Sequence, residues 1–184
     1  MEQQKKSRFT IYTIVFTALM AALVCVVTFV RIPLLGSKVH LGNAAGLLAG
    51  LLLGGPAGGI AAGLGSALND MVSGYGLDEC IVTFISKFLM ALICGSIARN
   101  AKTRGGVTLA CAVGAVSYVA LYMCKTFIYR KFVYGLALPA VWVVMLEKLP
   151  ASAINAVFAI VVAPLLYAAL RPALKKTGIV DKMK

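Results

Sequence analysis

The stretch HLGNAAGLLAGLLLGGPAGGIAAGLGSALND, which runs from His40 to Asp70, decides how this chain folds. Its glycines recur every four residues, first from Gly42 and again from Gly55. On a helix, this spacing makes a smooth strip that lets a neighbouring helix approach closely inside a membrane. A Gly-Gly-Pro sequence at residues 54–56 separates the two runs, so the stretch predicts a hairpin of two helices. Its strongly polar residues lie only at the two open ends of that hairpin.

The composition is typical of a membrane protein. Of the 184 residues, 61% are hydrophobic and 13% are charged, whereas soluble domains average about 45–50% and about 25%. The net charge of +12 comes from short basic clusters between apolar runs, a pattern that favours cytoplasmic loops over a nucleic-acid-binding surface. The five cysteines form no C-x-x-C pair and mostly lie in apolar segments, so we expect neither a metal site nor a disulfide.

The apolar segments predict an all-α membrane protein, a bundle of about six transmembrane helices. A spanning helix needs about 20 mostly apolar residues, and the first such run is too long for a signal peptide. We expect spans at residues 10–30, 41–54, 56–73, 80–98, 106–128 and 150–170. A further apolar stretch, residues 132–146, is broken by Gly135 and Pro139 and is expected to be interfacial or re-entrant. Residues 1–184 are therefore expected to form a single integral membrane domain.

The distribution of lysine and arginine predicts the orientation. The loops on the side of the N-terminus carry eleven of these residues, and the loops on the other side carry five. By the positive-inside rule, both termini face the cytoplasm. The glycine-rich hairpin then turns on the cytoplasmic side and its polar ends open outward. No inverted repeat is apparent, which disfavours a conventional secondary transporter.

Polar residues inside the apolar spans converge on the outer third of the predicted bundle. A charged group within a span costs roughly 2.5–3.5 kcal/mol on insertion scales and usually marks a functional site. Lys87 lies about two turns into the fourth span, and Lys125 about one turn before the outer end of the fifth. The candidate binding residues are His40, Asn43, Asn69, Asp70, Tyr75, Lys87, Tyr122, Lys125 and Asn155.

These residues predict a pocket that opens outward and is closed by the loops at 31–40 and 73–80. Its tyrosines are candidate stacking walls, so it fits a small, partly aromatic, water-soluble ligand. The charge balance slightly favours a neutral or anionic ligand. We expect Lys38 and Lys148 to be ordinary interface lysines, and Asp78 and Glu79 to face water. The alternative reading is that the buried lysines snorkel or pair with Asp70 structurally.

The chain lacks the residue sets that catalysis requires, so we do not expect an enzyme. It contains one histidine, no H-E-x-x-H motif and no G-x-x-x-x-G-K-[ST] phosphate loop. The acidic residues are too few for a two-metal phosphotransferase. We accordingly expect no catalytic residue, no bound metal and no cofactor in this chain.

Three stretches resemble the substrate-binding S components of energy-coupling factor (ECF) vitamin transporters, in the group of riboflavin-, hydroxymethylpyrimidine- and pyridoxine-type S components. They are the hairpin that ends in GSALND, the run FISKFLMALICGSIAR at 84–99, and LPASAINAVFAIVVAPLLYAALRPAL at 149–174. The resemblance implies a multi-pass protein of the bacterial plasma membrane that captures a water-soluble vitamin or vitamin precursor from outside. It does not single out one vitamin.

The same resemblance implies partners that supply the energy. An S component hands its ligand to a shared module of one transmembrane coupling subunit and two ATPase subunits. Ala18 and Ala22 match the A-x-x-x-A pair by which the first helix contacts that module.

Two other functions stay open on the sequence. One is a structural or regulatory membrane protein without a ligand, whose lysines only pair with Asp70. The other is an autonomous transporter or channel for small solutes, against which the lack of polar residues in the inner half of the spans argues.

Overall fold

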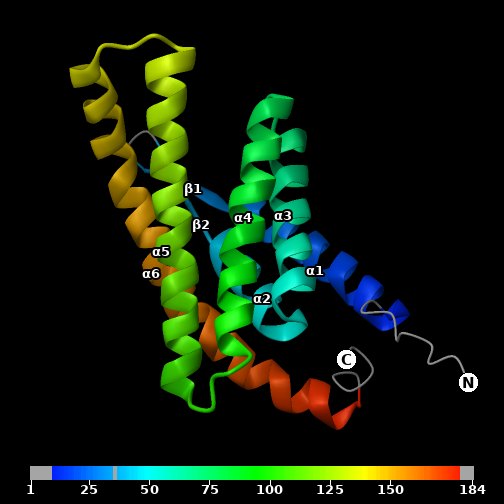
Figure 1. Cartoon of the computed structure of the whole chain (residues 1–184). Coiled ribbons are helices and arrows are strands. Elements are labelled where there is room, and N and C mark those ends of the chain that lie inside the picture. Colours follow the sequence, from blue (N-terminus) through cyan, green and yellow to red (C-terminus); the bar gives the residue numbers. More distant parts are fainter. Residues whose placement is uncertain (1–9, 35–36, 179–184) are drawn as a thin grey trace, which may run out of the picture.

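The computed structural model describes residues 10–34 and 37–178, which form six α-helices, a short hairpin and one π-helical turn (Figure 1). The elements are α1 (Ile11–Phe29), β1 (Arg31–Leu34), β2 (Ser37–His40), α2 (Gly42–Leu53), α3 (Gly55–Val72), α4 (Leu77–Ala98), α5 (Arg104–Ile128), η1 (Tyr129–Val133) and α6 (Leu138–Lys176). The predicted helical bundle is confirmed. The antiparallel pairing of β1 with β2, with Arg31 opposite His40, was not foreseen from the sequence.

Within the described residues, four helical segments are long and apolar enough to cross a membrane: α1, α4, α5 together with η1, and α6. The helix α2 is apolar but has only 12 residues. At 1.5 Å per residue it is roughly 18 Å long, well short of a hydrocarbon core of about 30 Å. Gly54 alone joins it to α3, at a φ of +81° that favours glycine, so the two helices form the expected hairpin.

The short helix α2 lies in the interior of the bundle, in contact with all the other α-helices. Its residues from Gly42 to Leu51 are buried. The glycine strips allow this close packing, because a Cβ on Gly50 would lie 2.5 Å from the carbonyl oxygen of Ala91 in α4. The same holds along α3, where a Cβ on Gly63 would lie 2.9 Å from the Phe84 ring. The small-residue spacing thus has the packing role that the sequence predicted.

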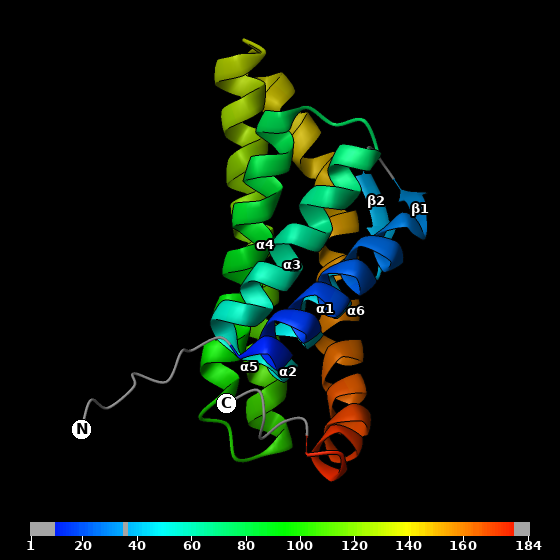
Figure 2. The same ribbon diagram turned by 90° about the vertical axis from the view of Figure 1, so that its right-hand side faces the viewer.

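The stretch 132–146 is not an element of its own but joins the ends of two helices. Its first residues end η1, a turn at Gly135 with a φ of +66° follows, and the rest begins α6. Pro139 lies in the first turn of α6, where a missing backbone N–H costs nothing. The helix then continues through Pro150 for 39 residues, so it begins well before the predicted residue 150. The outer parts of α5 and α6 consequently extend beyond α3 and α4 (Figures 1 and 2).

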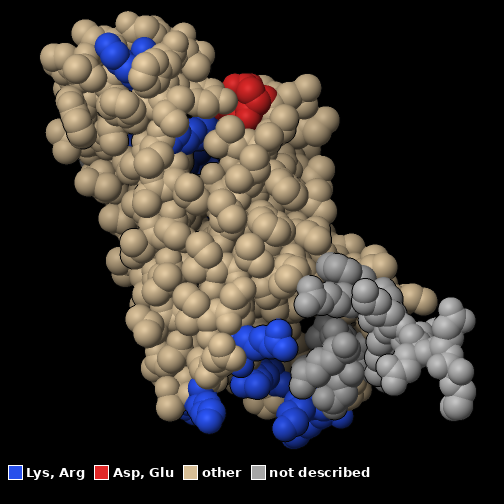
Figure 3. All heavy atoms as spheres, in the orientation of Figure 1, with Lys and Arg blue, Asp and Glu red and all other residues tan. Residues whose placement is uncertain are grey.

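Basic side chains gather at one end of the bundle, at the bottom of Figure 3. The α4–α5 connection and the end of α6 contribute them: Arg99, Lys102, Arg104, Arg171, Lys175 and Lys176. These residues belong to the loops that predict a cytoplasmic side. The other basic residues of that prediction, among them Lys5, Lys6 and Arg8, lie outside the described residues. The orientation itself stays a prediction.

Candidate functional site

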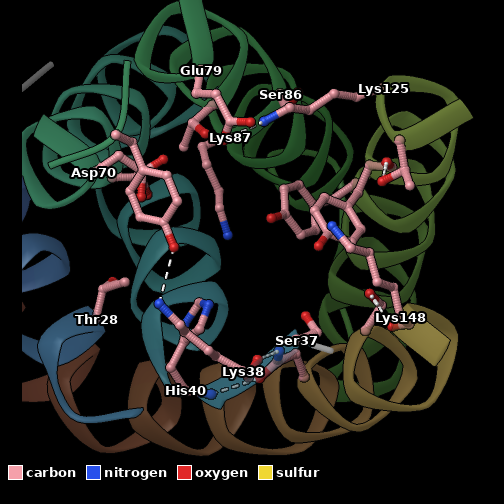
Figure 4. A pocket seen from close by; sticks show the side chains of 18 of the residues that line it. Thr28, Ser37, Lys38, His40, Asp70, Glu79, Ser86, Lys87, Lys125 and Lys148 are labelled. Atoms are coloured by element: carbon pink, nitrogen blue, oxygen red, sulfur yellow. Dashed lines mark hydrogen bonds and ion pairs between the residues drawn. The ribbon is translucent and has the colours of Figure 1, made fainter. Parts of the chain in front are cut away.

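A cavity of about 250 Å³ lies at the end of the bundle opposite the basic cluster, between α3, α4, α5 and α6 and beside the β1–β2 hairpin (Figure 4). Eight of the nine predicted binding residues line it: His40, Asn69, Asp70, Tyr75, Lys87, Tyr122, Lys125 and Asn155. The ninth, Asn43, does not line the cavity but contacts Lys87 through its side chain and is 1% exposed. The structure therefore brings together residues from six different elements, as polar residues in apolar spans led us to expect.

Lys87 points into this cavity from α4 and is only 4% exposed (Figure 4). Its ammonium group donates a hydrogen bond to the Asn43 side-chain oxygen. It also lies 3.8 Å from the centroid of the Tyr118 ring, a cation–π contact. Among the described residues it forms no ion pair with Asp70, so its partners are neutral. This contact pattern does not support the reading that Lys87 and Asp70 form a structural pair.

One face of α3 presents polar groups that lack partners. Ser66, Asn69 and Asp70 are spaced three and four residues apart, so they share a face of the helix, and all three line the cavity. The Ser66 hydroxyl and the Asn69 side-chain oxygen are buried without a hydrogen bond in the described part of the chain. The Asp70 carboxylate likewise has no hydrogen bond or ion pair to any described residue. An unpartnered buried polar group costs about 1–3 kcal/mol, so this face is suited to bind hydrogen-bonding groups of a ligand.

Asn155 on α6 holds the β1–β2 hairpin in place. Its side-chain oxygen accepts a hydrogen bond from the His40 backbone N–H at 2.8 Å, and its amide nitrogen donates to the Lys38 carbonyl at 2.8 Å. Both ends of the amide are thus engaged with the backbone of β2. Asn155 borders the cavity, but its contacts make it a positioning residue for the hairpin.

The hairpin is also tied to the α3–α4 connection, as the predicted pair of closing loops requires. The Arg31 guanidinium donates to the Ser73 hydroxyl at 2.5 Å. The Lys38 ammonium donates to the Tyr75 hydroxyl at 2.9 Å, which is visible in Figure 4. Leu35 and Gly36, which lie between β1 and β2 in the sequence, are outside the described residues.

His40 is held in its neutral form beside the cavity. Its Nδ1 accepts a hydrogen bond from the Gly42 backbone N–H at 3.1 Å, which leaves the proton on Nε2. Burial, followed by the positive charges of Lys87, Arg31 and Lys38, lowers the pKa of His40 to about 3. At neutral pH the imidazole is therefore an uncharged hydrogen-bonding group.

Two tyrosines of α5 form an aromatic wall of the cavity. Tyr118 and Tyr122 lie one helical turn apart, with ring centroids 6.2 Å apart and an interplanar angle of 21°. Tyr122 was predicted from the sequence and Tyr118 was not. Aromatic faces of this kind stack on planar rings.

Two expectations about charged residues are wrong. Lys148 lines the cavity rather than an ordinary interface, and Glu79 is half-buried and faces the cavity rather than bulk water. Lys38 is exposed, as an interface lysine would be, and also borders the cavity. Glu79 forms an ion pair with Lys125 at 3.3 Å, and the Lys148 ammonium lies 5.6 Å from the Tyr122 ring centroid. Asp78 is exposed, as expected.

For Glu79 and Lys148 the reason is that the helices continue beyond the apolar spans. α4 begins at Leu77 and α6 at Leu138, so residues assigned to loops lie on helices that face the cavity. One signal in the sequence could have found Lys148. It lies four and seven residues before Ser152 and Asn155, which places all three on one helical face. Other lining residues that the sequence did not single out are Thr28, Arg31, Ser37, Ser66, Thr83, Ser86, Tyr118, Thr126, Tyr129, Arg130, Tyr134 and Ser152.

The alanine pair of the first helix lies on the outside of the bundle. Ala18 and Ala22 are both exposed on α1, whereas their neighbour Ala21 is buried. A strip of small exposed residues on a membrane helix allows another helix to approach closely.

Comparisons with known proteins cover most of the chain. A family model described as "ECF-type riboflavin transporter, S component" matches residues 8–172. A solved structure described as "Structure and mechanism of the S component of a bacterial ECF transporter" superposes with a TM-score of 0.71 at 20% sequence identity. That match covers 89% of this chain and 97% of the other, and at this identity it shows a shared fold. No curated protein sequence matches the chain.

Proposed function

The chain belongs to the S-component family of ECF transporters, and from this premise we propose that the described cavity is the site at which it captures a water-soluble vitamin or vitamin precursor from outside the cell. S components are integral proteins of the plasma membrane that bind a substrate, and ATP is hydrolysed by their partners. The chain is therefore a transport protein and not an enzyme.

The observation that carries this proposal is the unpartnered polar face of α3. Ser66 and Asn69 keep buried oxygen atoms without hydrogen bonds, opposite an aromatic wall formed by Tyr118 and Tyr122. A planar vitamin ring with polar substituents matches both surfaces. Riboflavin is the first candidate to test, because it is the substrate that the family description names.

The module that supplies the energy is proposed to consist of one transmembrane coupling subunit and two ATPase subunits. Ala18 and Ala22 are proposed as the contact with the coupling subunit. Their exposure on α1, with no large side chain at either position, supports this role.

Mass spectrometry of small molecules released by heat tests the proposal directly. The full chain would be purified in detergent beside Lys87→Met, which removes the buried charge and keeps the length of the side chain. Lys131→Met is the matched control, because Lys131 lies at the same end of the protein and outside the cavity lining. We expect a stoichiometric vitamin-like compound from the wild type and the control, and its loss from folded Lys87→Met.

An empty extract from all three proteins, together with no thermal shift from a panel of vitamins, would contradict the proposal. The remaining alternatives would then separate by flux into liposomes. Flux without ATPase partners would indicate an autonomous transporter, and its absence would indicate a structural role.

A further inference from the structure

We propose that the ligand of this cavity carries an anionic group, a phosphate ester or a carboxylate, bound between Lys87 and Lys148. This inference rests on the proposed function of the cavity as the vitamin site. It goes beyond that function, because uncharged riboflavin has no such group.

The cavity has a strong excess of positive charge. Six cationic side chains line it, and two acidic ones, Asp70 and Glu79, oppose them; the cations are Arg31, Lys38, Lys87, Lys125, Arg130 and Lys148. The one ion pair among them in the described residues joins Lys125 to Glu79. Even with Asp70 counted in full, the described lining has four more basic than acidic side chains.

The uncompensated cations are held by neutral groups. Lys87 contacts the Asn43 amide and the Tyr118 ring, Lys38 donates to a tyrosine hydroxyl, and Lys148 lies over the Tyr122 ring. Such contacts orient an ammonium group without supplying a counter-charge. Lys87 is the buried member of this group, and a buried charge without a counter-ion attracts an anion more strongly than a charge in water does.

The positions of two of these lysines locate the anion. Lys87 extends from α4 and Lys148 from α6, and both reach toward the opening in the middle of Figure 4. The Tyr118–Tyr122 wall lies beside both ammonium groups. A planar ring against that wall would hold an anionic substituent within reach of the two lysines. Charge-assisted hydrogen bonds of this kind are roughly twice as strong as neutral ones.

The neutrality of His40 supports the same electrostatic field. Its imidazole is kept uncharged partly by the positive charges of Lys87, Arg31 and Lys38. The field that repels a proton from His40 attracts an anion to the same cavity.

Matched ligand pairs that differ by one phosphate test the inference. Riboflavin and riboflavin 5′-phosphate, and pyridoxal and pyridoxal 5′-phosphate, would be titrated into the purified full chain by calorimetry. In the pair that binds, we expect the phosphorylated member to bind at least about tenfold more tightly. Its affinity should fall several-fold when the salt concentration rises from about 0.05 to about 0.5 M, while the affinity of the other member changes little.

Lys148→Gln and Lys131→Gln form the matched pair of variants. Lys148→Gln should lower the affinity for the phosphorylated ligand about tenfold. The affinity for its unphosphorylated partner should stay within about twofold of the wild-type value. Lys131 lies outside the cavity lining, so Lys131→Gln should change neither affinity.

Equal affinity within a pair, tighter binding of the uncharged member, or an equal response to salt would overturn the inference and leave the proposed function standing. The compound released on heating extends the test to vitamins outside these pairs. An anionic compound supports the inference, and an uncharged or cationic one overturns it. If no compound is released and no vitamin binds, the proposed function fails and the inference fails with it.

Discussion

At the scale of single residues, Asn155 shows how one side chain can define the border of a site. It is 6% exposed, and both ends of its amide bind the backbone of β2. The hairpin has few other fixed points, chiefly the bonds from Arg31 and Lys38 to the α3–α4 connection. Its position therefore depends on a residue more than a hundred positions away in the sequence.

Asn155→Ala should release the hairpin and leave the bundle folded. The loss of two hydrogen bonds, each worth about 0.5–1.5 kcal/mol, predicts a destabilisation of roughly 1–3 kcal/mol. Hydrogen exchange should speed up at the His40 amide and stay unchanged in α4. Asn100→Ala, at an exposed position at the other end, is the control. Unchanged protection of the hairpin in Asn155→Ala would contradict this role.

The lowered pKa of His40 predicts that the protein loses stability in acid. Its pKa in the folded protein is about 3, below the ordinary value of 6.5, so the unfolded chain takes up a proton more readily. The free energy of unfolding should therefore decrease as the pH falls from about 6.5 toward 3.

The melting temperature between about pH 7.5 and 4.5 measures this effect. His40→Asn keeps a side-chain acceptor for the Gly42 N–H and should show a shallower decline. The chain has one histidine, so its imidazole NMR signals can be followed directly and should stay neutral at about pH 5. An imidazole that titrates near 6.5 in the folded protein would refute the prediction.

At the scale of the elements, the glycine strips decide how closely α2 packs. A Cβ on Gly50 meets the backbone oxygen of Ala91 at 2.5 Å, and one on Gly95 meets the backbone oxygen of Gly50 at 2.5 Å. Backbone atoms cannot move aside as a flexible side chain can. The α2–α4 contact therefore requires glycine on both helices.

Gly50→Ala should lower the free energy of unfolding by about 1–3 kcal/mol through overpacking. Gly105→Ala is the matched control, because the nearest atom to its new Cβ is 4.0 Å away. We expect a clear drop in melting temperature for the first variant and almost none for the second. Equal melting temperatures would mean that the helices can separate at little cost.

The outer face of α1 leads to a prediction about assembly. Ala18→Trp should prevent the coupling subunit from approaching and should sharply reduce copurification of the module, while ligand affinity stays within about twofold. Leu19→Trp, one residue along the same exposed helix, is the control. Copurification that survives Ala18→Trp and fails in Leu19→Trp would place the contact on another face.

At the scale of the whole molecule, the basic end and the cavity end lie at opposite ends of the bundle (Figure 3). In a background without cysteine, Lys102→Cys should react with an impermeant reagent only from the cytoplasmic side. Asp78→Cys, exposed at the cavity end, should react only from outside. The reverse pattern would contradict the predicted orientation and the capture of ligand from outside.

The sequence by itself determined the helical bundle, the glycine-rich hairpin and eight of the described residues that line the cavity. Apolar segments of spanning length and small residues at four-residue spacing are local patterns, so no tertiary contact is needed to recognise them. Polar residues such as Asp70 and Lys87 stand out because burying them in apolar spans is costly. Residues of this kind in a span therefore usually have a function.

Only the tertiary structure decided which partners these groups have. The β1–β2 hairpin depends on Asn155, and Lys87 takes Asn43 rather than Asp70 as its partner. Lys148 and Glu79 line the cavity because α6 and α4 begin before their apolar cores. These contacts join residues that are far apart in the chain. No local pattern of hydropathy or charge encodes them, since each depends on how the helices pack and where they end.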